Sequence, residues 1–151
     1  VGTLRSQGFE FSVAGNLTDR IELFGGYTFT DATITESSDP ANIGRRFANI
    51  PRHSGSLMLT YLVTSRLQVG GQVYAQDRLY GGTQLAGTAS VPGYARVDAV
   101  VRWRPIDALE LRANVLNVFD QTYYDAIYRS SSPFAYIAPG RSATLTASLR
   151  Y

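Results

Sequence analysis

Apolar and polar side chains alternate strictly along the last twelve residues of the chain, GRSATLTASLRY at 140–151. From residue 143 on, the odd positions hold Ala, Leu, Ala, Leu and Tyr, and the even positions hold Thr, Thr, Ser and Arg. A period of two predicts a β-strand with one apolar face. A tyrosine at the very end suits a membrane interface, where its ring contacts lipid and its hydroxyl contacts water. This segment is therefore expected to be a transmembrane strand.

The same alternation recurs in six earlier segments, again with the apolar side chains on odd positions. These strands are predicted at about residues 6–17, 20–33, 54–63, 66–78, 93–104 and 109–115. Short turns are expected near residues 17, 64 and 106, the first over 16–19, and long loops over 34–53, 81–92 and 120–139. Short turns at one end of a sheet and long loops at the other are typical of an outer-membrane barrel.

Aromatic side chains on the odd face fall into two rows, as in the aromatic girdles of membrane barrels. The row toward the long loops is Phe9, Phe11, Tyr27, Phe29 and Phe119, and the row toward the short turns is Tyr61, Trp103 and Tyr151. A soluble β-sandwich or lipocalin-like barrel also alternates. It is the weaker interpretation, because a dry core rarely has Tyr and Trp at both ends with Gly and Ala between them.

Composition narrows the possibilities further. No window approaches the eighteen or more apolar residues of a transmembrane helix, whereas a barrel is compatible with 44% hydrophobic and 17% charged residues. The net charge of +2 is too small to favour a nucleic acid as partner. With no cysteine and one histidine, His53, the sequence offers neither a metal-ligand cluster nor a catalytic constellation. We therefore expect neither an enzyme nor a bound cofactor.

The number of predicted strands is odd. Single-chain bacterial barrels use an even number, so that both termini lie in the periplasm. If Tyr151 is periplasmic, seven strands place the N-terminus at the extracellular end. We therefore expect residues 1–151 to be the C-terminal segment of a larger barrel, without a plug domain and with two edges that need partners.

Three short motifs resemble TonB-dependent outer-membrane receptors, and the resemblance covers nearly the whole chain. NVFD at 117–120, followed by two tyrosines at 123–124, resembles their penultimate-strand signature, and PGR at 139–141 resembles the entry to their last strand. NIPRH at 49–53 is similar to a recurrent segment further upstream. Residues 126–139 most resemble ferric-siderophore receptors, catecholate ones included.

The resemblance implies an all-β, antiparallel transmembrane barrel of about twenty-two strands closed by a plug. It implies a receptor in the outer membrane of a Gram-negative bacterium that imports a ferric siderophore or similar scarce nutrient. The implied partners are outer-membrane lipid and lipopolysaccharide, the receptor's own plug and, through it, TonB, and the barrel assembly machinery via the C-terminal strand. The alternative is a small structural or adhesive outer-membrane barrel whose long loops bind surfaces. A plug and a TonB-contacting box encoded upstream would favour the receptor, whereas a signal peptide immediately before Val1 would favour the small barrel.

Arginine and tyrosine in or beside the long loops are the candidate ligand residues, since a ferric siderophore is bulky, often anionic and aromatic. These candidates are Arg45, Arg46, Arg78, Tyr80, Arg129 and Tyr136. The competing interpretation is that they contact lipopolysaccharide phosphates or one another. Tyr123, Tyr124 and Tyr128 are interpreted as interface anchors.

The charges on the even face are expected to be mainly structural, pairing with the plug of a receptor or across the lumen of a small barrel. They are Glu10, Glu22, Arg96, Asp98, Arg102, Arg104, Glu110 and Arg112.

Overall fold

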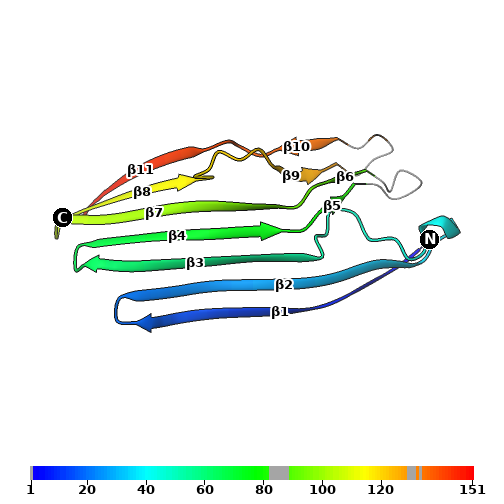
Figure 1. Ribbon diagram of the computed structural model, residues 1–151, viewed down its shortest axis with the longest axis horizontal. Helices are drawn as coiled ribbons and strands as arrows, with labels where there is room; N and C mark the ends of the chain where they lie inside the picture. Colours follow the sequence, from blue (N-terminus) through cyan, green and yellow to red (C-terminus); the bar gives the residue numbers. More distant parts are fainter. Residues whose placement is uncertain (1, 82–88, 129–131, 133) are drawn as a thin grey trace.

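The computed structural model of the chain describes residues 2–81, 89–128, 132 and 134–151. Seven of its strands pair antiparallel in a single curved layer, in the order β1-β2-β3-β4-β7-β8-β11 (Figure 1). Their bounds are β1 Thr3–Thr18, β2 Ile21–Glu36, β3 His53–Thr64, β4 Leu67–Gln76, β7 Tyr94–Ile106, β8 Leu109–Leu116 and β11 Ser142–Leu149. The prediction of seven antiparallel strands is confirmed.

The cross-strand register keeps the two faces of the sheet distinct. Outside the bulges, odd residues pair with odd residues in every ladder, as in Phe9 with Phe29, Leu59 with Gly71 and Leu145 with Ala113. Opposed residues in an antiparallel ladder point to the same side of the sheet. The predicted odd positions therefore share one face of the sheet, which is mainly apolar, and the even positions share the other face, which is mainly polar.

The two ends of the sheet differ as predicted. Three two-residue turns, at residues 19–20, 65–66 and 107–108, lie at the end where the chain finishes, and the N-terminus lies at the opposite end (Figure 1). In the first two turns a threonine hydroxyl, that of Thr18 or Thr64, accepts the backbone N–H groups two and three residues ahead at 3.1–3.2 Å. We call the end of the sheet that carries these three turns the short-turn end.

Two of the predicted turns were displaced by one to three residues. The first was expected over 16–19, but Asn16 stays in the ladder opposite Glu22, and the Thr18 hydroxyl sets the turn at 19–20. The third was expected near residue 106 but lies at 107–108, because Pro105 continues in β7 at a register shift between Trp103 and Ile106. A proline is tolerated at such a bulge because no ladder hydrogen bond is required of it.

The predicted long loops contain short elements of their own, and we call their side of the sheet the long-loop end. These are the 3-10 turn η1 Pro40–Asn42 and two small hairpins, β5 Leu79–Tyr80 with β6 Ser90–Val91 and β9 Tyr124–Ile127 with β10 Ala135–Ile137. β2 also continues into the first loop, as far as Glu36.

The hairpins share a small apolar core. Leu79, Val91 and Ile127 are each only 4% exposed, and Tyr124 packs against them. A Cβ on Gly81 would lie 2.5 Å from Ile127, so a side chain at residue 81 would displace the isoleucine. In the described part of the chain, no helix is long and apolar enough to cross a bilayer.

Candidate functional site

A cationic cluster lies on the polar face toward the short-turn end. Glu110 on β8 accepts hydrogen bonds from Arg104 at 2.9 Å and Arg112 at 3.3 Å, and Arg102 lies 3.7 Å from the same carboxylate. Three guanidiniums around one carboxylate leave a local excess of positive charge. Beside them, Glu22 accepts hydrogen bonds from Thr60 at 3.0 Å and Gln68 at 3.2 Å. Several of the predicted polar-face charges are thus paired between neighbouring strands of this chain.

On the same polar face, closer to the long-loop end, Arg96 is surrounded by tyrosines. Its guanidinium donates to the Asp98 carboxylate at 3.0 and 3.2 Å and to the Tyr123 hydroxyl at 3.0 Å. Its central carbon lies 6.0 Å from the ring centroids of both Tyr74 and Tyr123. Tyr94 completes the group, with its ring 4.2 Å from Tyr123 and 5.8 Å from Tyr74. We call Tyr74, Tyr94, Arg96 and Tyr123 the Tyr–Arg cluster.

The Tyr–Arg cluster was missed at the level of sequence. Tyr123 was expected to be an interface anchor, but it is only 5% exposed and contacts Arg96, so that expectation is wrong. Tyr124, expected to have the same role, packs against the small hairpin core. The available signal was Tyr74 and Tyr94, which occupy even positions of adjacent predicted strands. The ladder places Tyr74 opposite Arg96 and Tyr94 opposite Gln76.

The NVFD motif forms a turn that connects three strands. Asn117 has a positive φ of 53° and is only 2% exposed. Its backbone N–H donates to Asp98 on β7 at 2.8 Å, while its side-chain amide donates to the Gln121 carbonyl at 2.9 Å and accepts the Gln121 N–H at 3.0 Å. Asp120 in turn accepts the backbone N–H of Arg141, just before β11, at 2.7 Å. The motif that carried the resemblance is thus a structural link between β7, β8 and β11.

The NIPRH motif has a similar role for the hairpins. Asn49, at φ 59°, donates its backbone N–H to the Tyr80 carbonyl at 2.9 Å, and its side-chain oxygen accepts the Ile127 N–H at 3.3 Å. This residue therefore ties the first long loop to both β5 and β9.

Of the predicted ligand residues, the structure brings Arg46 and Tyr80 into contact. The Arg46 guanidinium lies 5.9 Å from the centre of the Tyr80 ring, at the long-loop end. The Arg45 carbonyl accepts the Ile34 N–H at 3.0 Å, and the Arg78 N–H donates to Asp77 at 2.7 Å.

Tyr136 lies on the β9–β10 hairpin, where it forms an exposed aromatic row with Phe134 and Tyr128, with ring centroids 5.4 and 4.8 Å apart. Arg129 lies outside the described residues.

On the apolar face, aromatic side chains predicted for the row toward the long loops contact one another across β1 and β2. Phe9 packs on Phe29 and Tyr27, with centroids 5.6 and 5.8 Å away. Phe11, the cross-strand partner of Tyr27, is 63% exposed. The next two pairs toward the long-loop end, Gln7 with Asp31 and Arg5 with Thr33, are polar.

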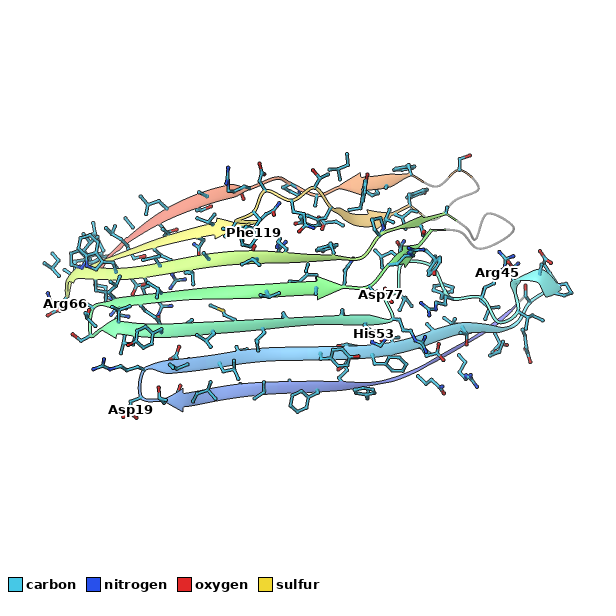
Figure 2. The ribbon with its side chains drawn as sticks, viewed as in Figure 1. Asp19, Arg45, His53, Arg66, Asp77 and Phe119 are labelled. Atoms are coloured by element: carbon cyan, nitrogen blue, oxygen red, sulfur yellow. The ribbon has the colours of Figure 1, made fainter. Side chains whose placement is uncertain are left out.

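The second row lies beside the short turns. Tyr61 pairs with Ile21 and Trp103 with Leu67, while Tyr151 is fully exposed. Phe119, which was predicted in the row toward the long loops, is 75% exposed and lies beyond the end of β8, about midway along the sheet (Figure 2). From Ile21 to Phe29 is about 27 Å along β2 at 3.4 Å per residue. A strand tilt of 35–45° reduces this to about 20 Å, close to the height of a barrel's apolar band.

The comparisons with known proteins agree with this geometry. The family model "TonB dependent receptor-like, beta-barrel" matches residues 1–118. The probable TonB-dependent receptor BfrD of Bordetella pertussis is 36% identical over 99% of this chain and 21% of its own length. The crystal structure of the siderophore receptor PiuA from Acinetobacter baumannii covers 100% of this chain and 22% of its own, with a TM-score of 0.90 and 32% identity.

The closed form of the ferric-catecholate import receptor Fiu from Escherichia coli covers 99% of this chain and 21% of its own, with a TM-score of 0.87 and 31% identity. The chain thus spans about one fifth of the length of these relatives. It belongs to the TonB-dependent receptor-like β-barrel family.

Proposed function

We propose that this chain is part of an outer-membrane receptor of a Gram-negative bacterium that binds and imports a ferric siderophore or a similar scarce nutrient. The observation that carries the proposal is the Tyr–Arg cluster, which offers a guanidinium between aromatic rings on the face away from lipid. The printed names of PiuA and Fiu, a siderophore receptor and a ferric-catecholate import receptor, support it. The full-length barrel of about twenty-two strands belongs to the same proposal.

The chemistry of the Tyr–Arg cluster fits an anionic, aromatic iron chelate. A guanidinium pairs with carboxylate or catecholate oxygens, and rings on either side stack on flat ligand groups. The Asp98 carboxylate fixes the orientation of Arg96, so little side-chain freedom is lost on binding. Arg46 and Tyr80 would provide a similar contact further out. Arg45, Arg78, Arg129 and Tyr136 are proposed as outer contacts.

Further partners follow from the same proposal. The surplus of arginine around Glu110 would face acidic groups of a plug, through which TonB would deliver energy. β11, ending close to Tyr151, would be the strand that the barrel assembly machinery engages. Lipid and lipopolysaccharide would surround the apolar face.

The test measures binding and uptake of radioactive ferric siderophore by cells that carry the full-length gene, under iron limitation. Arg96→Gln is expected to lower ligand affinity about tenfold, since it removes a charged hydrogen-bond donor. Arg66→Ala is the matched control, because Arg66 pairs with the exposed Asp107 at the short-turn end. The proposed site would be refuted if ferric siderophore binding were unchanged both in Arg96→Gln and in the double variant Arg46→Ala, Tyr80→Ala.

The size of the native polypeptide separates the receptor from the small adhesive barrel. An antibody against residues 140–151 should detect in outer membranes a band several times longer than this chain. A band that corresponds to about 151 residues would refute the receptor and favour the alternative.

A further inference from the structure

An apolar groove of about 720 Å³ crosses the outer face of β2, β3 and β4, on the side opposite the Tyr–Arg cluster. Tyr27, Leu57 and Val73 form its walls, and Gly55 and Ala75 form its floor. His53 and Asp77 line its end toward the long loops, where β3 begins and just beyond the end of β4 (Figure 2). The groove opens onto the face that we propose contacts lipid.

The depth of the groove comes from two small residues placed side by side. The ladders put Gly55 opposite Tyr27 on one side and opposite Ala75 on the other. The next pair toward the short-turn end, Leu57 with Val73, is larger. A Cβ on Gly55 would lie 3.0 Å from the Gly26 carbonyl oxygen and 3.6 Å from the Tyr27 ring, so the ring partly covers the glycine. The result is a channel bounded by larger side chains.

The end of the groove toward the long loops carries polar groups, at the level of the aromatic row that contains Tyr27 and Phe29. The Tyr27 hydroxyl and the His53 Nδ1 are hydrogen-bonded at 2.6 Å, and the His53 ring lies 5.2 Å from Phe29. Arg52 places its guanidinium 5.3 Å from the Phe29 ring. This is the height at which lipid headgroups begin.

Arg52 is a cation without an acidic partner in the described part of the chain. No carboxylate of those residues lies within ion-pair distance, and its Nε is buried without a hydrogen-bond partner. Asp77, on the other side of the end of the groove, already accepts the Arg78 N–H at 2.7 Å. Asp77 lines the end of the groove and offers a carboxylate acceptor there. Arg52 precedes the lining residue His53 in the chain and brings a positive group beside that end, over the Phe29 ring.

We propose that this groove binds lipopolysaccharide, with one acyl chain along Leu57, Val73 and Ala75 and a lipid A phosphate at Arg52. A guanidinium fork matches a phosphate, and a sugar hydroxyl can donate to Asp77. The long-loop end is the outer leaflet in the proposed orientation, which selects lipopolysaccharide over phospholipid. The inference rests on the proposed insertion in the outer membrane but not on siderophore import.

The test measures binding of a fluorescent, phosphorylated lipid A to the full-length receptor purified from outer membranes in detergent. Ala75→Leu fills the groove, and Arg52→Gln removes its cation. Each should weaken binding about tenfold or more, whereas Arg52→Lys should retain part of it. Ala113→Leu is the matched control, because Ala113 occupies the same apolar face on β8, outside the groove.

Three outcomes would overturn the inference. Equal weakening by Ala75→Leu and Ala113→Leu would mean that the groove has no special role. Full binding by Arg52→Gln would remove the phosphate contact, and equal competition by phosphatidylglycerol would mean that the site is not selective for lipid A. The uptake assay keeps the two proposals apart. If the groove variants bind lipid A normally and uptake of ferric siderophore is also normal, the lipopolysaccharide site is refuted and the receptor proposal is not.

Discussion

The carboxylate of Asp98 accepts the backbone N–H of Asn117 at 2.8 Å, across from β7 to the turn that follows β8. Its second oxygen accepts two hydrogen bonds from Arg96 at 3.0 and 3.2 Å. One buried side chain therefore fixes both the turn before β9 and the guanidinium of the Tyr–Arg cluster. The proposed ligand contact and the entry to the last strand share a common support.

Replacing Asp98 by alanine should lower the free energy of unfolding by about 2–3 kcal/mol, because a buried N–H and a guanidinium lose their acceptor. The measurement is urea unfolding of the full-length protein refolded into lipid vesicles. Asp107→Ala is the control, since that side chain is 97% exposed and its pair with Arg66 should contribute at most about 1 kcal/mol. Similar losses for both variants would contradict the role given to Asp98.

Asn117→Ala should be more damaging than Asn117→Gly, although glycine is the smaller residue. Both variants lose the two side-chain hydrogen bonds to Gln121. Only alanine also has to adopt the left-handed backbone at φ 53°, which costs about 1–2 kcal/mol. The same unfolding assay measures the difference. If the two variants are equally stable, the backbone conformation is not what selects asparagine here.

Arginine should be far less acceptable at Leu145 than at its neighbour Thr144. Leu145 lies on the apolar face of β11 and is 74% exposed, whereas Thr144 lies on the polar face opposite Asn114. A cation facing the middle of the bilayer costs about 2–4 kcal/mol, and one facing the lumen costs much less. Heat-modifiable migration in gels would report the folded fraction of each variant. The reverse order would mean that the two faces have been exchanged.

Glu110→Gln should make stability depend on salt. The substitution leaves Arg102, Arg104 and Arg112 together without their carboxylate, so the folded state contains mutual repulsion that added salt screens. The urea midpoint of the variant should fall at low salt and recover toward the parent value at high salt. Glu36→Gln, at an exposed residue that accepts a hydrogen bond from Thr3, should show no such trend. An equal salt response in both variants would argue against the cluster.

How well the sequence predicted each part of the molecule depended on the length of the strand and on whether the feature involved more than one strand. The long strands were predictable because each runs past enough residues to display its period, as Leu145 and Thr144 do on the two faces of β11. The two hairpins in the long loops were missed, since their strands have only two to four residues and a period cannot be recognised over so short a run. The first turn was displaced because the Thr18 hydroxyl determines its position.

The Tyr–Arg cluster and the groove were missed for a different reason. Both depend on which residues the ladders place side by side, such as Tyr74 with Arg96 and Gly55 with Ala75. A register is a relationship between strands, and the pattern along one strand does not contain it. The candidate ligand residues were chosen by residue type and by their position in or beside the predicted loops, and among the described residues the structure places Arg46 against Tyr80.

The separation of the two aromatic rows has a consequence for where this protein can be stable. The sheet is one layer, so the hydrophobic driving force for its odd face comes from hydrocarbon outside the protein and not from a second sheet. Rows about 20 Å apart match only a thin apolar slab. A thicker bilayer would stretch over polar residues such as Gln7 and Asp31 and incur hydrophobic mismatch. The spacing of the rows thus sets a preferred membrane thickness, and the stability of the protein depends on the length of the surrounding lipids as well as on temperature.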